Sequence, residues 1–489
     1  MTVTVVAIFA IVYLCCIQYR TLASGPHFPA RWPLLRLDRI CVRNLPSAVA
    51  PTAASVGDHH APLAGEGANV KPNVEWTSGN RVHLLENGDA YFPAILDAID
   101  AAEREVLIET FILFEDRVGR DLQQHSINAT ARGVEVDLTV DGFGSPDLSN
   151  DFISALTDAG VRLHVYEPTP PVRQLKPLRR LHRKIVVVDG RIAFVGGINF
   201  SEDHLESFGA RAKQDYAVRI EGPVVDRIHS FACQALAPVQ RRLKMERPAM
   251  REDSQVASRV AASEPQTLPG SAEVAFVSRD NHDHRTDIER AYRMAIRTAR
   301  DTEFIANAYF FPGYRLLRDL RRAASRGVTV QLILPNDPDV QIARVAARLL
   351  YESLMKDGVT IHEYCRRDMH CKVAVVDGIW STVCSTNLDP LSLSLNLEAN
   401  VLIRDAEFAA TLQRRLQHLI EHDCEQLNPD VLPRLTMWRY LTGSLAYHVS
   451  RGFPRWLRML PSSSSRIRSF VRGQHIDTTT AFDASANGD

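Results

Sequence analysis

The chain has 489 residues, which is enough for two or three domains with sizeable cores. Its 57 lysines and arginines nearly balance 58 aspartates and glutamates, for a formal net charge of -1. This balance argues against a general nucleic-acid-binding protein, which usually carries a basic excess. The eight cysteines form no CxxC pair and no secreted framework, so we expect reduced thiols in a protein that faces the cytoplasm.

The N-terminal region combines an apolar segment with a linker. Residues 1–20 are almost wholly apolar, yet short for a membrane-spanning helix, which needs about 20 apolar residues. They also lack the basic start of a signal peptide, and the arginines that follow would favour the cytoplasmic side. A membrane anchor, a peripheral anchor and an over-extended gene start remain open. Residues 21–75, rich in Pro, Ala and Gly, predict a disordered linker.

Residues 76–244 and 271–426 alternate predicted strands and helices. In the first stretch we expect a helix over 117–132, between a buried strand in VLIETFILF and another in GVEVDLTVDG. The second stretch repeats this order, because TARDTEFIANAYFF matches AAEREVLIETFILF. The alternation predicts an α/β sandwich in each half. Residues 245–270, polar and without periodicity, are predicted to link the halves.

The C-terminal region lacks the alternation of the two halves. In residues 427–460, aromatic and aliphatic side chains are interleaved with arginines, and Leu432–Leu460 contains no acid. This pattern favours an amphipathic segment on an anionic membrane surface, with a helix docked on the core as the alternative. Residues 461–489 are rich in Ser, Thr and Ala and predict a disordered tail.

The chemistry-bearing pattern is H-x-K-x-x-x-x-D, which occurs once in each half. After each copy, at the same distance, come a small residue, a spacer and an asparagine. The first copy and its followers are His182, Lys184, Asp189, Gly197 and Asn199. The second set is His370, Lys372, Asp377, Ser385 and Asn387. Two such matches in one chain are not credible as chance.

These residue types suit phosphoryl chemistry. On an extended chain, residues i and i+2 point to one face, so each imidazole projects with an ammonium that can hold a phosphate oxygen. One histidine would form phosphohistidine, while the other protonates the leaving alkoxide and deprotonates the incoming alcohol. We favour His182 as the nucleophile and His370 as the acid and base. The two asparagines, Gly197 and Ser385 are predicted to bind phosphate, and Asp189 and Asp377 to brace the strands.

Each catalytic histidine needs an orienting carboxylate. Asp215 follows the first motif and Glu398 follows the second at a comparable distance. We therefore predict that Asp215 orients His182 and Glu398 orients His370.

The duplicated motif resembles that of the phospholipase D superfamily. From about Trp76 to about Pro461 the chain is similar to the bacterial cardiolipin synthases of the B type. Segments carrying this resemblance include ETFILFED, DGFGSPDLS, KQDYAVRIEGPVV, IANAYFFPGYR and STNLDPLSLSLNLEANV. The resemblance implies two sandwich halves facing each other across one shared active site, with no metal and no cofactor. One departure is Cys384, where the family has Gly; a left-handed backbone there would weaken the second phosphate site.

We expect a phosphatidyltransferase that moves the phosphatidyl group of phosphatidylglycerol to a second phospholipid hydroxyl, releasing glycerol and forming cardiolipin. The resemblance and the basic segments imply phospholipid partners, an anionic membrane surface and no nucleic acid. They also imply the bacterial inner membrane, with the catalytic region on the cytoplasmic side. The alternatives are a phospholipid hydrolase that releases phosphatidate, a nucleic-acid phosphodiesterase and a membrane scaffold with a decayed site.

Overall fold

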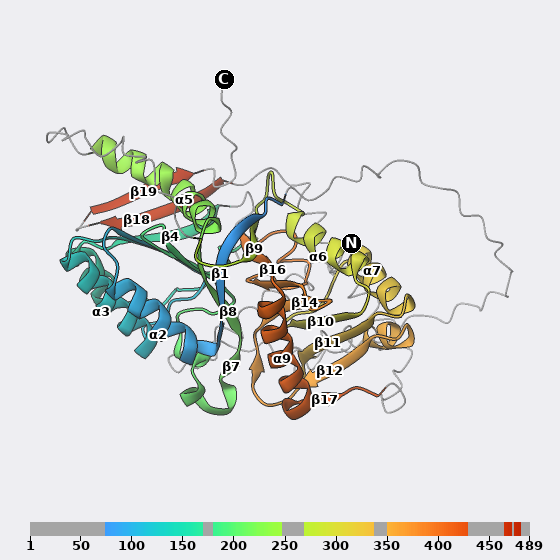
Figure 1. Ribbon diagram of the computed structural model, residues 1–489. Helices are drawn as coiled ribbons and strands as arrows, with labels where there is room; N and C mark the ends of the chain where they lie inside the picture. The colour runs from blue at the N-terminus through green and yellow to red at the C-terminus, as the bar shows by residue number, and fades with distance from the viewer. Residues whose placement is uncertain are drawn as a thin grey trace, which may run out of the picture.

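The computed structural model describes residues 74–169, 179–246, 268–336, 350–428, 464–471 and 474–480. Within these ranges the chain forms two mixed α/β halves with the same order of elements, which lie side by side (Figure 1). The predicted fold class is therefore confirmed.

The first half is built on one mixed sheet. Its strands are β1 (Thr77–Glu86), β2 (Glu105–Thr110), β3 (Glu135–Asp141), β4 (Arg162–Thr169), β5 (Ile185–Val188), β6 (Ile192–Gly196) and β8 (Tyr216–Glu221). The order across the sheet is β4-β3-β2-β5-β6-β8-β1, with β2, β3 and β4 parallel to one another. The strands are rich in Val and Ile, as expected for strands buried on both faces.

The second half repeats this sheet. Its strands are β9 (Ala272–Arg279), β10 (Thr302–Asn307), β11 (Thr329–Pro335), β12 (Thr360–Tyr364), β14 (Lys372–Val376), β15 (Trp380–Cys384), β16 (Glu398–Arg404) and β17 (Cys424–Gln426). The order is β17-β12-β11-β10-β14-β15-β16-β9, so each strand of the first sheet has its counterpart. Strand β1 also pairs with β9 and joins the two sheets.

Helices cover these sheets. They are α2 (Asn87–Asp100), α3 (Arg117–Ala131), α4 (Asn150–Ala159), α5 (Val224–Glu246), α6 (Asp287–Thr298), α7 (Tyr314–Ser325) and α9 (Ala406–Asp423). Helix α3 begins where the Asp116 carboxylate accepts the Gly119 N–H at 3.0 Å, and α9 begins in the same way at Asp405. Helix α5 extends through Glu246, slightly into the predicted linker at 245–270.

Three apolar clusters hold the layers together. One packs α2, α3 and α4 on the outer face of the first sheet, and another packs α6 and α7 on the second. The third is shared by both halves: it joins Val187 and Ile228 of the first half to Val375 and Leu412 of the second. Because this cluster is buried, the halves form one body and not two loosely tethered domains.

The C-terminal region corrects one prediction. Residues 461–489 were predicted to be a disordered tail, but β18 (Ser464–Val471) and β19 (Gln474–Thr480) form an antiparallel hairpin. Strand β18 extends the first sheet by pairing with β4 (Figure 1). Ile467 is fully buried, and the Ser469 hydroxyl lies 2.9 Å from His164 Nδ1. The high Ser and Thr content predicts disorder, although polar and apolar residues alternate in β18 in a way that suits an edge strand.

Several sequence predictions lie outside the described residues. They are the apolar segment at 1–20, most of the linker at 21–75, most of the linker at 245–270 and nearly all of the amphipathic segment at 427–460. Among the helices of the described part of the chain, none has the length and apolarity that crossing a membrane requires.

Candidate active site

The two motifs occupy equivalent places in the two sheets. His182 and Lys184 immediately precede β5, while His370 precedes β14 and Lys372 is its first residue. A β-branched run follows each lysine and forms a central strand of its half. All four side chains are buried or nearly so, as expected for charged groups only when they meet partners.

The orienting carboxylates are exchanged between the halves. His182 Nδ1 lies 3.0 Å from Glu398 Oε2, and His370 Nδ1 lies 2.5 Å from Asp215 Oδ2. The prediction that Asp215 serves His182 and Glu398 serves His370 is therefore wrong. Proximity in sequence suggested the same-half pairing, but the halves face each other, so each carboxylate reaches the opposite imidazole.

Main-chain hydrogen bonds reinforce this exchange. The His182 N–H donates to the Leu397 carbonyl at 2.9 Å, directly before Glu398. In the same way, the His370 N–H donates to the Gln214 carbonyl at 2.9 Å, directly before Asp215. Around the second contact, β13 (Asp368–Met369) pairs with β7 (Lys213–Gln214). Each half therefore positions the other half's histidine through its backbone as well as its carboxylate.

The two lysines lie within one electrostatic cluster. Lys184 Nζ donates to the His182 carbonyl at 2.8 Å, and Lys372 Nζ lies 3.0 Å from His370 Nδ1. Burial lowers the pKa of Lys184, and charges from both halves, Glu398 and Asp215 among them, act on that ammonium. Burial also lowers the pKa of Lys372. An anion that enters the cluster would raise the pKa of both lysines and favour their charged form.

The carboxyl groups of the two histidine–carboxylate pairs differ in pKa. Burial raises the pKa of Asp215 to about 6, against the lowering effect of Lys372. Burial raises the pKa of Glu398 too, but hydrogen bonds from His182 and Ser385 and the nearby Lys184 hold it below the usual value. Burial lowers the pKa of His182 to about 4 and holds that of His370 well below its usual range. Both imidazoles are therefore neutral at pH 7 before an anion binds.

Asp189 and Asp377 brace the sheets. The Asp189 carboxylate accepts the N–H groups of Glu103, Arg104 and Glu105 at 2.8–3.0 Å, and Asp377 does the same for residues 300–302. Each aspartate follows the last residue of its strand, roughly 20 Å along an extended chain from the histidine. These contacts support the bracing role and place neither carboxylate beside the imidazoles, although the motif grouped them with the catalytic residues.

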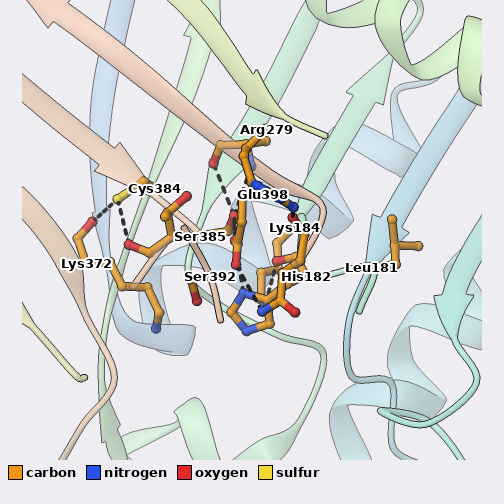
Figure 2. Close-up of polar contacts among 12 residues, drawn as sticks. Leu181, His182, Lys184, Arg279, Lys372, Cys384, Ser385, Ser392 and Glu398 are labelled. Carbon is orange, nitrogen blue, oxygen red and sulfur yellow. Dashed lines mark hydrogen bonds and ion pairs between the residues drawn. The ribbon is translucent and has the colours of Figure 1, made fainter. Parts of the chain in front are cut away.

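Gly197 and Ser385 serve the carboxylates and not a phosphate. The Gly197 N–H donates to the Tyr216 carbonyl, and an added Cβ would lie 2.4 Å from Asp215 Oδ1. Ser385 Oγ donates to Glu398 Oε2 at 2.5 Å, and its N–H donates to the Ala399 carbonyl (Figure 2). The prediction that these two residues bind phosphate is wrong, because both N–H groups and the hydroxyl already have acceptors.

Each asparagine of the site has one buried polar atom without a hydrogen-bond partner among the described residues. Asn199 Oδ1 accepts the Ile112 N–H at 3.2 Å, while its buried Nδ2 has no partner among the described residues. Asn387 likewise has a buried Oδ1 without a partner in the described part of the chain. Because an unpaired buried donor is costly, Asn199 Nδ2 is a candidate donor to a bound phosphodiester. The unpaired Oδ1 of Asn387 only accepts hydrogen bonds, so phosphate binding by Asn387 stays a prediction.

Cys384 is accommodated within an ordinary strand. It ends β15, and the positive-φ residues of the described chain other than glycine are Asn87, Asp189 and Asp377. Its buried thiol donates to the Lys372 carbonyl at 2.7 Å (Figure 2). The backbone therefore does not need glycine at this position, and the second site is not weakened by strain.

Sequence reasoning missed several buried residues around the histidines. Arg279 lies beside Glu398 across the β9–β16 pair, and its guanidinium donates to the Asn396 carbonyl (Figure 2). His204 packs against His370 with ring centroids 5.4 Å apart, and Phe111 packs against His182 at 5.1 Å. Arg279 and His204 lie outside the motifs, and no local sequence pattern distinguishes them.

Two groups of described residues bring three possible metal ligands within 4.8 Å of one another. They are Glu105, His229 and Cys233 in the first group and His204, Asp215 and His370 in the second. In both, the shortest contact is a histidine–carboxylate hydrogen bond, at 2.7 and 2.5 Å. These hydrogen bonds account for the approach of the donors, and the expectation of a site without metal stays a prediction.

Comparison with known proteins identifies relatives that cover most of the chain. The family model described as "Cardiolipin synthase, PLD-like domain" matches residues 95–231 and 292–420. Cardiolipin synthase B of Salmonella typhi is 48% identical over 397 residues, 80% of this chain and 93% of that protein. Cardiolipin synthase B of Escherichia coli (strain K12) is 47% identical over 394 residues, with the same coverage of both chains.

A solved structure shares the fold. The crystal structure of phosphatidylserine synthase from Haemophilus influenzae Rd KW20 matches with a TM-score of 0.58 at 14% sequence identity. The match covers 80% of this chain and 98% of that one. At this identity the likeness establishes the two-half architecture alone.

Proposed function

Because the chain belongs to the cardiolipin synthase family of phospholipase D-like proteins, we propose that it transfers a phosphatidyl group between phospholipids and forms cardiolipin. The single observation that carries the chemistry is the exchanged pairing of His182 with Glu398 and His370 with Asp215. This pairing joins both motifs into one buried cluster. Two separate active sites would not require such a pairing.

His182 is the nucleophile in this proposal. Its Nδ1–H donates to Glu398, so the lone pair on Nε2 remains for attack on phosphorus. Lys184, Lys372 and Asn199 bind the phosphoryl oxygens. The anionic phosphodiester raises the pKa of His370 as it binds, so this imidazole enters the reaction protonated. As the bond from Nε2 to phosphorus forms, the bond to the glycerol oxygen breaks, and that oxygen takes the extra proton from His370. The products of this step are free glycerol and a phosphatidyl-histidine.

The second step reverses the first with a different alcohol. The hydroxyl of a second phospholipid gives its proton to His370 while its oxygen attacks phosphorus and the bond to His182 breaks. Asp215 supports His370 in this role, because a carboxyl with a pKa near 6 lets the pair hold a proton near neutrality. Glu398 stays ionised beside His182. An anionic partner suits His182, because this imidazole acts as the nucleophile.

Phosphatidylglycerol is the proposed donor, since its glycerol headgroup leaves as a neutral alcohol. The proposed place of work is the cytoplasmic surface of the bacterial inner membrane, where anionic phospholipid surrounds the enzyme. Hydrolysis to phosphatidate is the competing outcome at the same intermediate, because water and a lipid hydroxyl offer the same attacking atom.

Product analysis tests the proposal. The full chain is incubated with mixed micelles of phosphatidylglycerol, and the lipids are identified by mass spectrometry. We expect cardiolipin and glycerol from the wild type, and a loss of at least about a thousandfold in His182→Ala and in His370→Ala. His125→Ala is the matched control, because His125 pairs with Asp100 away from both motifs. Phosphatidate without cardiolipin, or full synthesis by both motif variants, would contradict the proposal.

A further inference from the structure

The two catalytic histidines have different neighbours at one equivalent position. The spacing that takes His182 to His370 and Asn199 to Asn387 also takes His204 to Ser392. His204 ends the short 3-10 helix η2 (Glu202–His204) and belongs to the first half, yet its ring packs on His370 of the second. The corresponding Ser392 of the second half is also buried, and the shared order of elements in the two halves assigns it to the His182 side of the site. The site is therefore filled by an imidazole on one side and by a hydroxymethyl group on the other.

Fixed contacts hold the His204 ring in place. Its Nε2 accepts the Asn199 N–H at 3.3 Å, which ties it to the first phosphate-binding loop. The adjacent Asp203 forms an ion pair with Lys213 at 2.5 Å, one residue before Gln214 and two before Asp215. The ring is fully buried and meets the His370 ring at 78°, edge to face. The segment that carries Asp215 therefore also helps to hold His204 in place.

The tautomer of His204 follows from these contacts. Burial lowers its pKa to about 3, so the ring is neutral, and acceptance at Nε2 leaves the proton on Nδ1. This buried Nδ1 has no partner among the described residues. An unpaired buried donor lowers stability, so this position carries a cost in the folded protein. An imidazole at this place therefore points to a role in the reaction.

We propose that His204 is a specificity residue that directs the phosphohistidine intermediate toward a lipid hydroxyl and away from water. The inference rests on the proposed function. In either outcome, the bond between phosphorus and His182 Nε2 breaks, a bond to the attacking oxygen forms, and that oxygen's proton passes to His370. Only the attacking molecule differs: a lipid alcohol gives cardiolipin and water gives phosphatidate. The buried ring of His204 packs against His370, the proposed proton acceptor, so it limits the room for a water beside that imidazole.

The size of the side chain makes this testable. Replacing His204 by Ser, the residue of the other half, removes most of an imidazole and leaves room for roughly one or two waters beside His370. Replacing it by Gln keeps an acceptor for the Asn199 N–H, a donor and most of the volume. The two variants therefore separate loss of volume from loss of polar contacts.

The experiment measures the ratio of phosphatidate to cardiolipin that the full chain forms from phosphatidylglycerol micelles. We expect His204→Ser to raise this ratio at least about tenfold, and His204→Gln to stay within about threefold of the wild type. His125→Ser is the control and keeps the wild-type ratio. An unchanged ratio in His204→Ser, or an equal fall of both products, would overturn the inference. Should His204→Ser not fold, His204→Asn must give a higher ratio than His204→Gln.

The two proposals fail differently. A wild type that makes only phosphatidate removes the proposed synthase function itself. A wild type that makes cardiolipin, with a ratio insensitive to residue 204, removes only the role of His204.

Discussion

The carboxylates beside the two histidines set different conditions for each half-reaction. Glu398 receives hydrogen bonds from His182 and Ser385, whereas Asp215 is desolvated and its pKa is raised to about 6. A carboxylate with a raised pKa becomes protonated as the pH falls through that value. Below about pH 6 His370 therefore loses its anionic partner, and with it the ability to take a proton from the incoming alcohol.

We predict that cardiolipin synthesis by the wild type falls as the pH drops through about 6. Asp215→Asn should lower the rate at pH 7 by about a hundredfold or more and abolish this acid limb, because the titrating group is gone. The measurement is the rate between pH 5 and 8 in mixed micelles. Glu398→Gln is the comparison and should keep the limb while losing rate. An acid limb retained by Asp215→Asn would assign it to another group.

The residue types could be predicted from sequence, but their partners could not. Two copies of one pattern sufficed to identify the histidines, lysines and carboxylates. Which carboxylate meets which imidazole depends on how the halves face each other, and chain proximity favoured the wrong answer. Ser385 was assigned to phosphate for a similar reason, since its bond to Glu398 forms only after β15 and β16 pair.

Each motif strand is fixed by the turn that ends it. Asp189 and Gly190 have φ values of 54° and 64°, and Asp377 and Gly378 have 51° and 61°. Each pair forms the left-handed centre of a turn closed by a backbone hydrogen bond, from Arg191 to Val188 and from Ile379 to Val376. In both turns the aspartate carboxylate also collects backbone N–H groups from the start of the neighbouring strand, β2 or β10. The turn therefore sets the register of the strand that carries the histidine.

We predict that Asp189→Ala and Asp377→Ala each lower the free energy of unfolding by about 2–4 kcal/mol, since several N–H groups lose an anionic acceptor. Asparagine tolerates the left-handed backbone and keeps one acceptor, so the Asn variants should lose about half as much. Urea unfolding of the four variants measures this. Loss of activity without loss of stability would instead assign the aspartates to the chemistry.

Sequence patterns predicted most helices and strands but missed the hairpin at one edge of the first sheet. Strands β2 and β3 were expected in VLIETFILF and GVEVDLTVDG, and helix α3 at residues 117–132. The β18–β19 hairpin was missed because its Ser and Thr content looked like a disordered tail. Its stability comes from tertiary contacts with β4, among them His164, whose other ring nitrogen lies 2.8 Å from Asp137. Those contacts leave no signal in the local composition.

At the scale of the whole molecule, duplication explains why the site lies between the halves. Each half supplies one histidine, one lysine and the carboxylate for the other half's histidine, so neither half contains a complete site. The shared apolar cluster holds the halves in this relation. The doubled architecture could be predicted from the repeated motif, whereas the exchange of carboxylates emerges only when both halves are placed together.

The central claim is that imidazoles from the two halves act on one phosphorus atom, with His182 as its covalent carrier. The most direct test is to quench the enzyme with alkali during turnover of phosphatidylglycerol labelled in its phosphate, since phosphohistidine survives alkali, and to map the labelled peptide. We predict label on the peptide that contains His182, and none in His182→Ala. Label on the His370 peptide, or cardiolipin formation by His182→Ala, would contradict the account.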